Sequence, residues 1–243
     1  MQFGKNESEK MKVLKNIEQT KIATNSSLDK ILGGGIEKGN ITQFYGPPGS
    51  GKTNISLLLA VQVVKNGKKV IYMDTEGGIS IDRIKQIAKD DFENVVNNII
   101  VFEPHSFQEQ ENDLKTIGSL LSSKGDEFDL IVLDSAVALY RLNDSKSPIL
   151  NKELGKQMGL LSTFSRKHDL SVLITNQIYS AFDGESNENI RPVGGDILRY
   201  WSKVIVELEK SDLVGKRIAN LRRHRSMSEG LSIKFKITNT GIC

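Results

Sequence analysis

The residues best suited to chemistry lie in one short segment, in which glycines flank a lysine and a threonine. Gly46, Gly51, Lys52 and Thr53 fill the spacing G-x-x-x-x-G-K-[ST], which binds phosphate when it joins a strand to a helix. Its glycines let backbone N–H groups turn inward around phosphate oxygens, and the helix N-terminus adds partial positive charge. We therefore expect ATP to bind along Gly46, Pro47, Pro48, Gly49, Ser50, Gly51, Lys52, Thr53 and Asn54.

Lys52 and Thr53 are expected to serve different parts of that ligand. The lysine ammonium would reach the β- and γ-phosphates, and the threonine hydroxyl would ligate Mg²⁺. A Mg²⁺-bound triphosphate also needs a carboxylate at the end of a neighbouring strand, and Asp134 directly follows the apolar run at residues 130–133. We expect Asp134 to help hold the metal, although a strand-terminal aspartate can also cap the next turn.

Hydrolysis of ATP further requires a group that orients and polarises a water molecule for in-line attack. The segment Asp74-Thr-Glu76 ends the second predicted strand, which we expect beside the strand leading into the P-loop. We assign the role to Glu76 rather than Asp74. Gln177 follows another apolar run and could hydrogen-bond the γ-phosphate, or equally be a solvated loop amide. The carboxyl ends of parallel strands share one crevice, so these side chains can converge although they are far apart in sequence.

Short β-branched runs alternate with amphipathic stretches along the chain, which is typical of repeated βαβ units. The pattern predicts strands at residues 41–45, 69–74, 98–103, 129–134, 171–176 and 203–208. It predicts helices at residues 52–65, 81–89, 107–122 and 153–167. Residues 217–221 and 231–238 are typical of antiparallel strands that extend one edge of a sheet. The expected fold class is α/β, a mostly parallel central sheet flanked by helices.

The composition limits what kind of protein this chain can be. Its 243 residues, 38% hydrophobic and 26% charged, suit one domain at residues 21–243, preceded by a flexible polar arm at residues 1–20. The only cysteine is Cys243, which excludes an internal disulfide and a cysteine-rich zinc site. There is neither an apolar run of about 18 residues nor a secretory signal, so we expect a cytoplasmic protein without membrane contact. The net charge of +3 does not by itself indicate nucleic acid.

Several strings around the P-loop resemble the RecA/RadA recombinase superfamily and, within it, the archaeal RadB family of DNA repair and recombination proteins. The most specific strings are DTEG at 74–77 and ITNQ at 174–177. The resemblance also rests on residues 24–39, 72–77, 130–141, 192–198 and 223–226, and runs from about residue 20 to the end. It implies a RecA-like P-loop ATPase core with antiparallel C-terminal strands.

The resemblance also implies roles and partners. It makes Glu76 the catalytic glutamate, Asp134 the Walker B aspartate and Gln177 the side chain that senses the γ-phosphate. It places Arg83 near the adenine ring. The implied partners are single-stranded or branched DNA, a RadA-type recombinase, a Holliday-junction nuclease and, in a homodimer, a second copy of the chain.

Two features depart from full recombinases. The resemblance makes residues 141–152 and 179–194 the two DNA-binding loops, but the second loop sets three acidic residues against Arg191, a balance that repels phosphate. The residues before the P-loop contain neither a helical N-terminal domain nor the Phe-x-x-Ala segment that docks onto a neighbouring subunit. We therefore expect neither filaments nor strand exchange.

A basic run near the end of the chain is the better candidate for a nucleic-acid contact. Arg222, Arg223, His224 and Arg225 are consecutive, and RadB-type proteins carry a Lys-His-Arg signature at this place. Arg223 stands where the signature has lysine, which keeps the charge but changes the hydrogen-bond geometry. A basic run is more often a solvated face, so DNA, the nucleotide of a neighbouring subunit and a partner protein all stay open as its target.

Three functions fit these features. The first is a slow ATPase that binds DNA and assists a recombinase, which the two departures favour. The second is a RecA-fold regulatory phosphotransferase of the clock-protein type, although such proteins usually carry paired glutamates where this chain has DTEG. The third is a non-hydrolysing switch in which ATP only selects a binding conformation.

Overall fold

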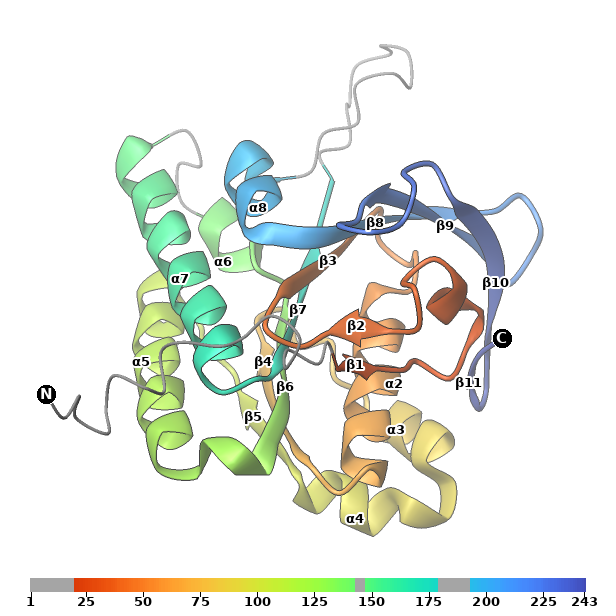
Figure 1. Ribbon diagram of the computed structural model, residues 1–243, viewed down its shortest axis with the longest axis horizontal. Helices are drawn as coiled ribbons and strands as arrows, with labels where there is room; N and C mark the ends of the chain where they lie inside the picture. The colour runs from red at the N-terminus through yellow and green to blue at the C-terminus, as the bar shows by residue number, and fades with distance from the viewer. Residues whose placement is uncertain (1–19, 143–146, 179–192) are drawn as a thin grey trace, which may run out of the picture.

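The computed structural model describes residues 20–142, 147–178 and 193–243, and a large sheet with helices on both faces forms its centre (Figure 1). The strands of this sheet are β3 (Ile41–Tyr45), β4 (Lys69–Asp74), β5 (Ile99–Phe102), β6 (Phe128–Asp134), β7 (Ser171–Asn176), β8 (Ser202–Lys210), β9 (Lys216–Arg223), β10 (Ser232–Thr238) and β11 (Gly241–Ile242). A separate pair consists of β1 (Lys21–Ile22) and β2 (Ile36–Glu37). The α-helices are α2 (Lys52–Lys65), α3 (Ile81–Ala88), α4 (Phe92–Asn97), α5 (Phe107–Lys124), α6 (Ala138–Arg141), α7 (Pro148–Lys167) and α8 (Gly195–Trp201).

The strand order is β11-β10-β9-β8-β3-β7-β6-β4-β5. All pairs from β8 to β5 are parallel, and the pairs β8–β9, β9–β10 and β10–β11 are antiparallel. The predicted α/β class, a mostly parallel sheet with antiparallel C-terminal strands, is therefore confirmed.

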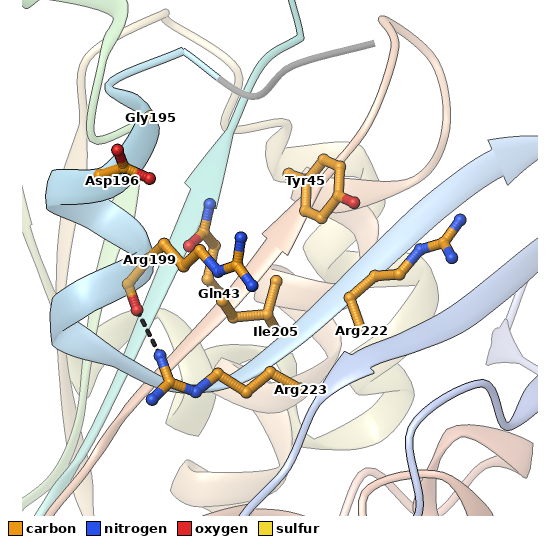
Figure 2. Close-up of a pocket in the computed structure, with 8 residues that line it drawn as sticks. All are labelled: Gln43, Tyr45, Gly195, Asp196, Arg199, Ile205, Arg222 and Arg223. Atoms are coloured by element: carbon orange, nitrogen blue, oxygen red, sulfur yellow. Dashed lines mark hydrogen bonds between the residues drawn. The ribbon is translucent and has the colours of Figure 1, made fainter. Parts of the chain in front are cut away.

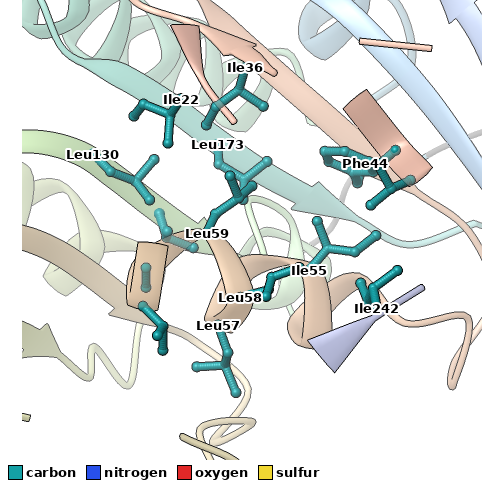
Figure 3. Close-up of a cluster of buried hydrophobic side chains, with 14 of the residues drawn as sticks. Ile22, Ile36, Phe44, Ile55, Leu57, Leu58, Leu59, Leu130, Leu173 and Ile242 are labelled. Carbon is teal, nitrogen blue, oxygen red and sulfur yellow. The ribbon is translucent and has the colours of Figure 1, made fainter. Parts of the chain in front are cut away.

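Side chains of the central strands alternate between two apolar cores, one on each face of the sheet. In β6, Leu130 and Val132 belong to the core that also contains α2, whereas Ile131 and Leu133 belong to the core that also contains α5 and α7. Figure 3 shows the first of these cores, where side chains of α2 meet those of the central strands and of the short β1 and β2. Because both faces are covered, these strands are apolar along their whole length rather than at every second residue.

The order of the strands corrects one expectation. Neither the strand before Glu76 nor the strand before Asp134 lies beside the P-loop strand, because β7 lies between β3 and β6, and β4 follows beyond β6. The helical crossovers of βαβ units let a strand that is late in the sequence insert between earlier ones. All of these parallel strands still end at the same edge of the sheet.

The predicted bounds of β3, β4, β7 and α2 agree with the structure. Helix α7 instead begins at Pro148, not at residue 153, because proline is pre-organised for the first helical turn and lacks only an N–H that would be unpaired there. Residues 148–152 of the predicted loop at 141–152 are therefore helical, and α6 includes Arg141. The sequence pattern did not predict α4, α6, β1, β2 or β11, which are too short to show a period.

Some predictions fall on residues that lie outside the described ranges. These are the arm at residues 1–20, apart from Thr20, and most of the loop at residues 179–194, with Arg191. Within the described residues, no helix combines the length and apolar character needed to cross a bilayer.

Candidate functional site

The P-loop leaves β3 at Gly46 and enters α2 at Lys52. A β-carbon on Gly46 would lie 2.2 Å from the carbonyl oxygen of Leu208 in β8, so only glycine fits this turn. Gly51 precedes the helix with φ of 107°, a left-handed conformation that glycine adopts without strain. The Lys52 ammonium donates to the carbonyl oxygens of Gly46 (2.8 Å) and Pro47 (3.1 Å), which holds the lysine along the loop.

Three predicted site residues meet the P-loop in one cavity of about 210 Å³. Glu76 follows β4, Asp134 ends β6 and Gln177 follows β7, so the ends of three strands bring them together. The P-loop residues that line the same cavity are Pro48, Gly49, Gly51, Lys52, Thr53 and Asn54. The expected convergence at the carboxyl edge of a parallel sheet is therefore present.

Asp134 is a buried carboxylate fixed by hydroxyl groups. The Tyr72 hydroxyl donates to its Oδ2 at 2.8 Å and the Thr175 hydroxyl donates to its Oδ1 at 2.5 Å. Burial raises the pKa of Asp134, while the hydroxyls of Thr175, Tyr72 and Thr53 lower it. A divalent cation shared with Thr53 would favour the charged carboxylate, so this donor set fits Mg²⁺ bound to phosphate.

The structure separates the roles of the two acidic residues that follow β4. Asp74 accepts hydrogen bonds from the backbone N–H groups of Glu76 (3.1 Å), Gly78 (3.0 Å) and Ile79 (2.9 Å). Its carboxylate thus shapes the turn after the strand and does not line the cavity. Glu76 does line it, together with Lys52 and Thr53, and its assignment as the group that orients water stays a prediction.

Glu76 belongs to a short chain of hydrogen bonds. Its Oε1 accepts from the Ser135 hydroxyl (2.5 Å) and from Gln177 Nε2 (2.7 Å). The Gln177 Oε1 in turn accepts from Arg141 Nη1 at 2.5 Å. Gln177 is therefore bonded to the predicted catalytic glutamate rather than being a purely solvated amide. A γ-phosphate entering this cavity would compete with Glu76 for the Gln177 amide.

Electrostatics in the cavity favour an anionic ligand beside Lys52. Burial lowers the pKa of Lys52, and the nearby carboxylates of Glu76 and Asp134 raise it. Lys210 of β8 also lowers it, since its side chain lies against the P-loop: a β-carbon on Gly49 would be 3.3 Å from Lys210 Cε. A bound triphosphate would therefore stabilise the charged form of Lys52.

Arg83 lies beside the cavity rather than within it. Its guanidinium donates to Asn54 Oδ1 (2.7 Å) and to the carbonyl oxygens of Thr238 (2.8 Å) and Gly241 (3.3 Å). Arg83 thus joins α3, the start of α2 and the turn between β10 and β11. Its predicted position near adenine stays a prediction, and its contact with Asn54 places it next to the P-loop helix.

The basic run near the C-terminus does not form one surface. His224 is buried and Arg225 pairs with buried Glu37 of β2, with 2.5 Å between Arg225 Nη2 and Glu37 Oε2. Arg222 forms an ion pair with Glu207, and Arg223 donates to the carbonyl oxygen of Arg199 at 2.7 Å. The cluster divides into a buried histidine followed by an exposed arginine that pairs with Glu37, and two arginines at the end of β9 that pair elsewhere.

Sequence reasoning missed several side chains that complete the site. Ser135, Tyr72 and Thr175 hold the two carboxylates, and the guanidinium of Arg217 donates to the carbonyl oxygen of Gly49 at 3.0 Å. The sequence could have indicated these three side chains, because a hydroxyl inside or directly after an apolar strand is buried and needs a hydrogen-bond partner. Arg217 carried no such signal, because its contact joins residues 168 positions apart.

Comparison with known proteins agrees with this architecture. The sequence model of the Rad51 family matches residues 15–243. Proteins named "DNA repair and recombination protein RadB" are 60% identical in Methanobrevibacter smithii and 52% identical in Methanothermobacter thermautotrophicus, each covering 96% of this chain and 100% of the relative. A solved structure of a RadB recombinase is 38% identical, with a TM-score of 0.77 over 91% of this chain and 98% of that one.

Proposed function

The chain belongs to the Rad51 family and, within it, to the RadB proteins, and we propose that it is an ATP-dependent accessory protein of DNA recombination and repair. It would bind ATP with Mg²⁺, hydrolyse ATP slowly, bind single-stranded or branched DNA, and assist a RadA-type recombinase without exchanging strands itself. A Holliday-junction nuclease and a second copy of the chain are further proposed partners. The names of its relatives, which specify DNA repair and recombination, support this assignment.

The observation that carries the proposal is the meeting of Lys52, Glu76, Asp134 and Gln177 in one cavity. ATP hydrolysis needs a phosphate-binding cation, a metal-binding carboxylate and a group that orients water. Lys52, Asp134 and Glu76 supply these respectively, and Gln177 links Glu76 to Arg141, in the segment that the family resemblance associates with DNA. Unaided, efficient strand exchange by the purified protein, or a failure to bind ATP, would contradict the proposal.

Replacement of Glu76 by glutamine tests the catalytic part. Glu76→Gln keeps the size of the side chain and its amide can still bond Ser135, but it removes the carboxylate that would polarise water. We expect unchanged ATP affinity and single-turnover hydrolysis slower by about 100-fold. Lys52→Ala should instead weaken ATP binding itself, because it removes the cation that contacts the phosphates.

The matched control is Glu93→Gln, which removes an exposed carboxylate of α4 that does not line the cavity. It should leave both ATP affinity and turnover unchanged. Equal turnover in Glu76→Gln and the unmodified protein would show that Glu76 is not catalytic. Recombination activity that survives Glu76→Gln but not Lys52→Ala would indicate the non-hydrolysing switch instead.

A further inference from the structure

The P-loop lies against the antiparallel strands that follow the nucleotide-binding core in the sequence. A β-carbon on Gly49 would lie 3.3 Å from Cε of Lys210 in β8. A β-carbon on Gly51 would lie 2.9 Å from Cδ1 of Ile237 in β10. The late strands of the chain therefore support the phosphate-binding loop from one side.

Arg217 of β9 forms a direct hydrogen bond with this loop. Its Nε donates to the carbonyl oxygen of Gly49 at 3.0 Å. Arg222 and Arg223 lie at the opposite end of β9 and line a different cavity, as Figure 2 shows. Arg217 is therefore the arginine through which β9 holds the P-loop.

Residues 47–50 form the turn on which this hydrogen bond acts. Gly49 has φ of 74°, and the Ser50 N–H donates to the carbonyl oxygen of Pro47 at 3.2 Å, which is the pattern of a β-turn with glycine at its third position. The Gly49 carbonyl and the Ser50 N–H belong to one planar peptide group and point in opposite directions. Because Arg217 holds the carbonyl toward β9, the N–H is directed at Pro47.

The turn also holds Lys52. The carbonyl oxygen of Pro47 that accepts from Ser50 accepts from the Lys52 ammonium as well, at 3.1 Å. A continuous series of hydrogen bonds therefore runs from Arg217 through the peptide group between Gly49 and Ser50 to the lysine. Aligned hydrogen bonds polarise one another, so the loss of the first bond weakens the others.

We propose that Arg217 is a positioning residue for nucleotide binding, which keeps the turn at residues 47–50 closed and so holds Lys52 in place for the phosphates. This inference rests on the proposed function, because it concerns the same nucleotide site. Lys210 contributes in a different way. It pairs in register with Arg217, and positive charges directly opposite each other repel. A triphosphate bound beside Gly49 offsets this repulsion, so Lys210 acts through its charge and Arg217 through its hydrogen bond.

The test compares the affinities of the full chain for ATP and for ADP, both measured with Mg²⁺. Arg217→Gln should weaken both by about tenfold, because the P-loop contacts are common to the two nucleotides. Single-turnover hydrolysis at saturating ATP should stay within about twofold of the unmodified protein, because the substitution leaves Glu76 in place. Arg217→Lys keeps the charge and a donor at this position, so it should lose less affinity than Arg217→Gln.

Salt separates the contributions of the two cations. Lys210→Gln should weaken ATP binding by about threefold at low salt, and this loss should disappear near 1 M salt, where screening acts within about 3 Å. The loss in Arg217→Gln should persist at high salt, because it comes from the geometry of the turn.

The matched control is Lys216→Gln, which removes one positive charge from the same strand, at an exposed position that pairs in register with Lys236 of β10. It should leave both affinities unchanged. Urea unfolding of each variant shows whether the affinities refer to folded protein, and Arg217→Lys provides the second substitution if Arg217→Gln does not fold.

Three results would overturn the inference. Unchanged affinity in Arg217→Gln, or an equal loss in Lys216→Gln, would do so while ATP binding stays established. A loss confined to ATP would also do so, and would place the Arg217 guanidinium on the γ-phosphate instead. Absence of ATP binding by the unmodified chain would contradict the proposed function as well.

Discussion

His224 is a single residue whose ionisation the fold opposes. Its side chain is 0% exposed, and Nδ1 accepts hydrogen bonds from the backbone N–H groups of Ser226 and Met227, both at 3.1 Å. Nδ1 is therefore unprotonated, and the proton of the neutral ring resides on Nε2, 4.0 Å from Glu37 Oε1. Burial lowers the pKa of His224; Glu37 raises it, and the cations Lys21 and Arg225 lower it. The buried histidine is thus a neutral cap for its own turn.

This environment makes stability depend on pH. Because the folded pKa of His224 is below its ordinary value of 6.5, the unfolded chain binds more protons at pH values between the two. The free energy of unfolding should therefore decrease as the pH falls from 6.5 through the folded pKa. His224→Asn keeps an acceptor for the two N–H groups but cannot titrate, so its stability should decline less between about pH 7 and pH 5. Urea unfolding over this range measures the difference.

His168 provides the comparison for that experiment. Burial lowers the pKa of His168 as well. Part of the pH dependence of stability therefore remains in His224→Asn. His168→Asn should remove only the part of the pH dependence of stability that comes from His168. An unfolding free energy that follows pH identically in His224→Asn and the unmodified protein would show that His224 is already solvated in the fold.

Among the secondary-structure elements, the late strands of the chain are attached to early helices through Arg83. Its side chain on α3 bonds Asn54 of α2 and two carbonyl oxygens at the turn between β10 and β11. Thr238 ends β10 and Gly241 begins β11, and the two residues pair in register, so the arginine ties this strand pair to α2 and α3. The contact joins residues 155 and 158 positions apart. Position in sequence therefore gave no indication of it.

Replacement of Arg83 should loosen this edge of the sheet. We expect Arg83→Gln to lower the free energy of unfolding by about 1–2 kcal/mol, because several modest hydrogen bonds are lost at a partly exposed site. Amide hydrogen exchange should accelerate at residues 238–242 more than in the central strands, which report global unfolding. Arg166→Gln, at an exposed position of α7, is the control and should change neither quantity. Uniform acceleration over the whole sheet would contradict a local role.

For the whole molecule, the nucleotide cavity couples ligand binding to folding. The cavity exists only when the ends of β3, β4, β6 and β7 lie side by side, so the unfolded chain has no such site. A ligand that binds only the folded state stabilises it by about 2.7 kcal/mol at a free concentration 100 times its Kd. We expect ATP with Mg²⁺ to raise the free energy of unfolding by that amount.

Chemical unfolding with and without the ligand measures this gain, and Lys52→Ala is the comparison. Burial lowers the pKa of the lysine, so its removal should not itself destabilise the fold, but the gain from ATP should largely disappear. ATP without Mg²⁺ should give a smaller gain, because the buried Asp134 carboxylate then lacks its cation. Equal stabilisation by ATP in the unmodified protein and in Lys52→Ala would show that the nucleotide binds outside this cavity.

Local chemistry explains what could be predicted from the sequence. The P-loop, the strands that end at Asp74 and Asp134, and helix α2 depend on residue types at fixed short spacings, since glycine freedom and apolar periodicity act within a few residues. The meeting of Glu76, Asp134 and Gln177 followed from the rule that parallel strands end at one edge. The sequence by itself thus determined the fold class, the family resemblance and the principal side chains of the nucleotide site.

Tertiary structure decided the matters that depend on distance in space. It inserted β7 between β3 and β6, a position that no spacing along the chain encodes. It divided four consecutive basic residues, burying His224 and pairing Arg225 with Glu37, while Arg223 donated to the carbonyl oxygen of Arg199. Strand β9 ends at Arg223, so His224 and Arg225 lie beyond the strand beside Glu37 of β2, whereas Arg222 and Arg223 stay on the strand. A run of charges forms one surface only where the backbone keeps its side chains together, and here the end of β9 separates them.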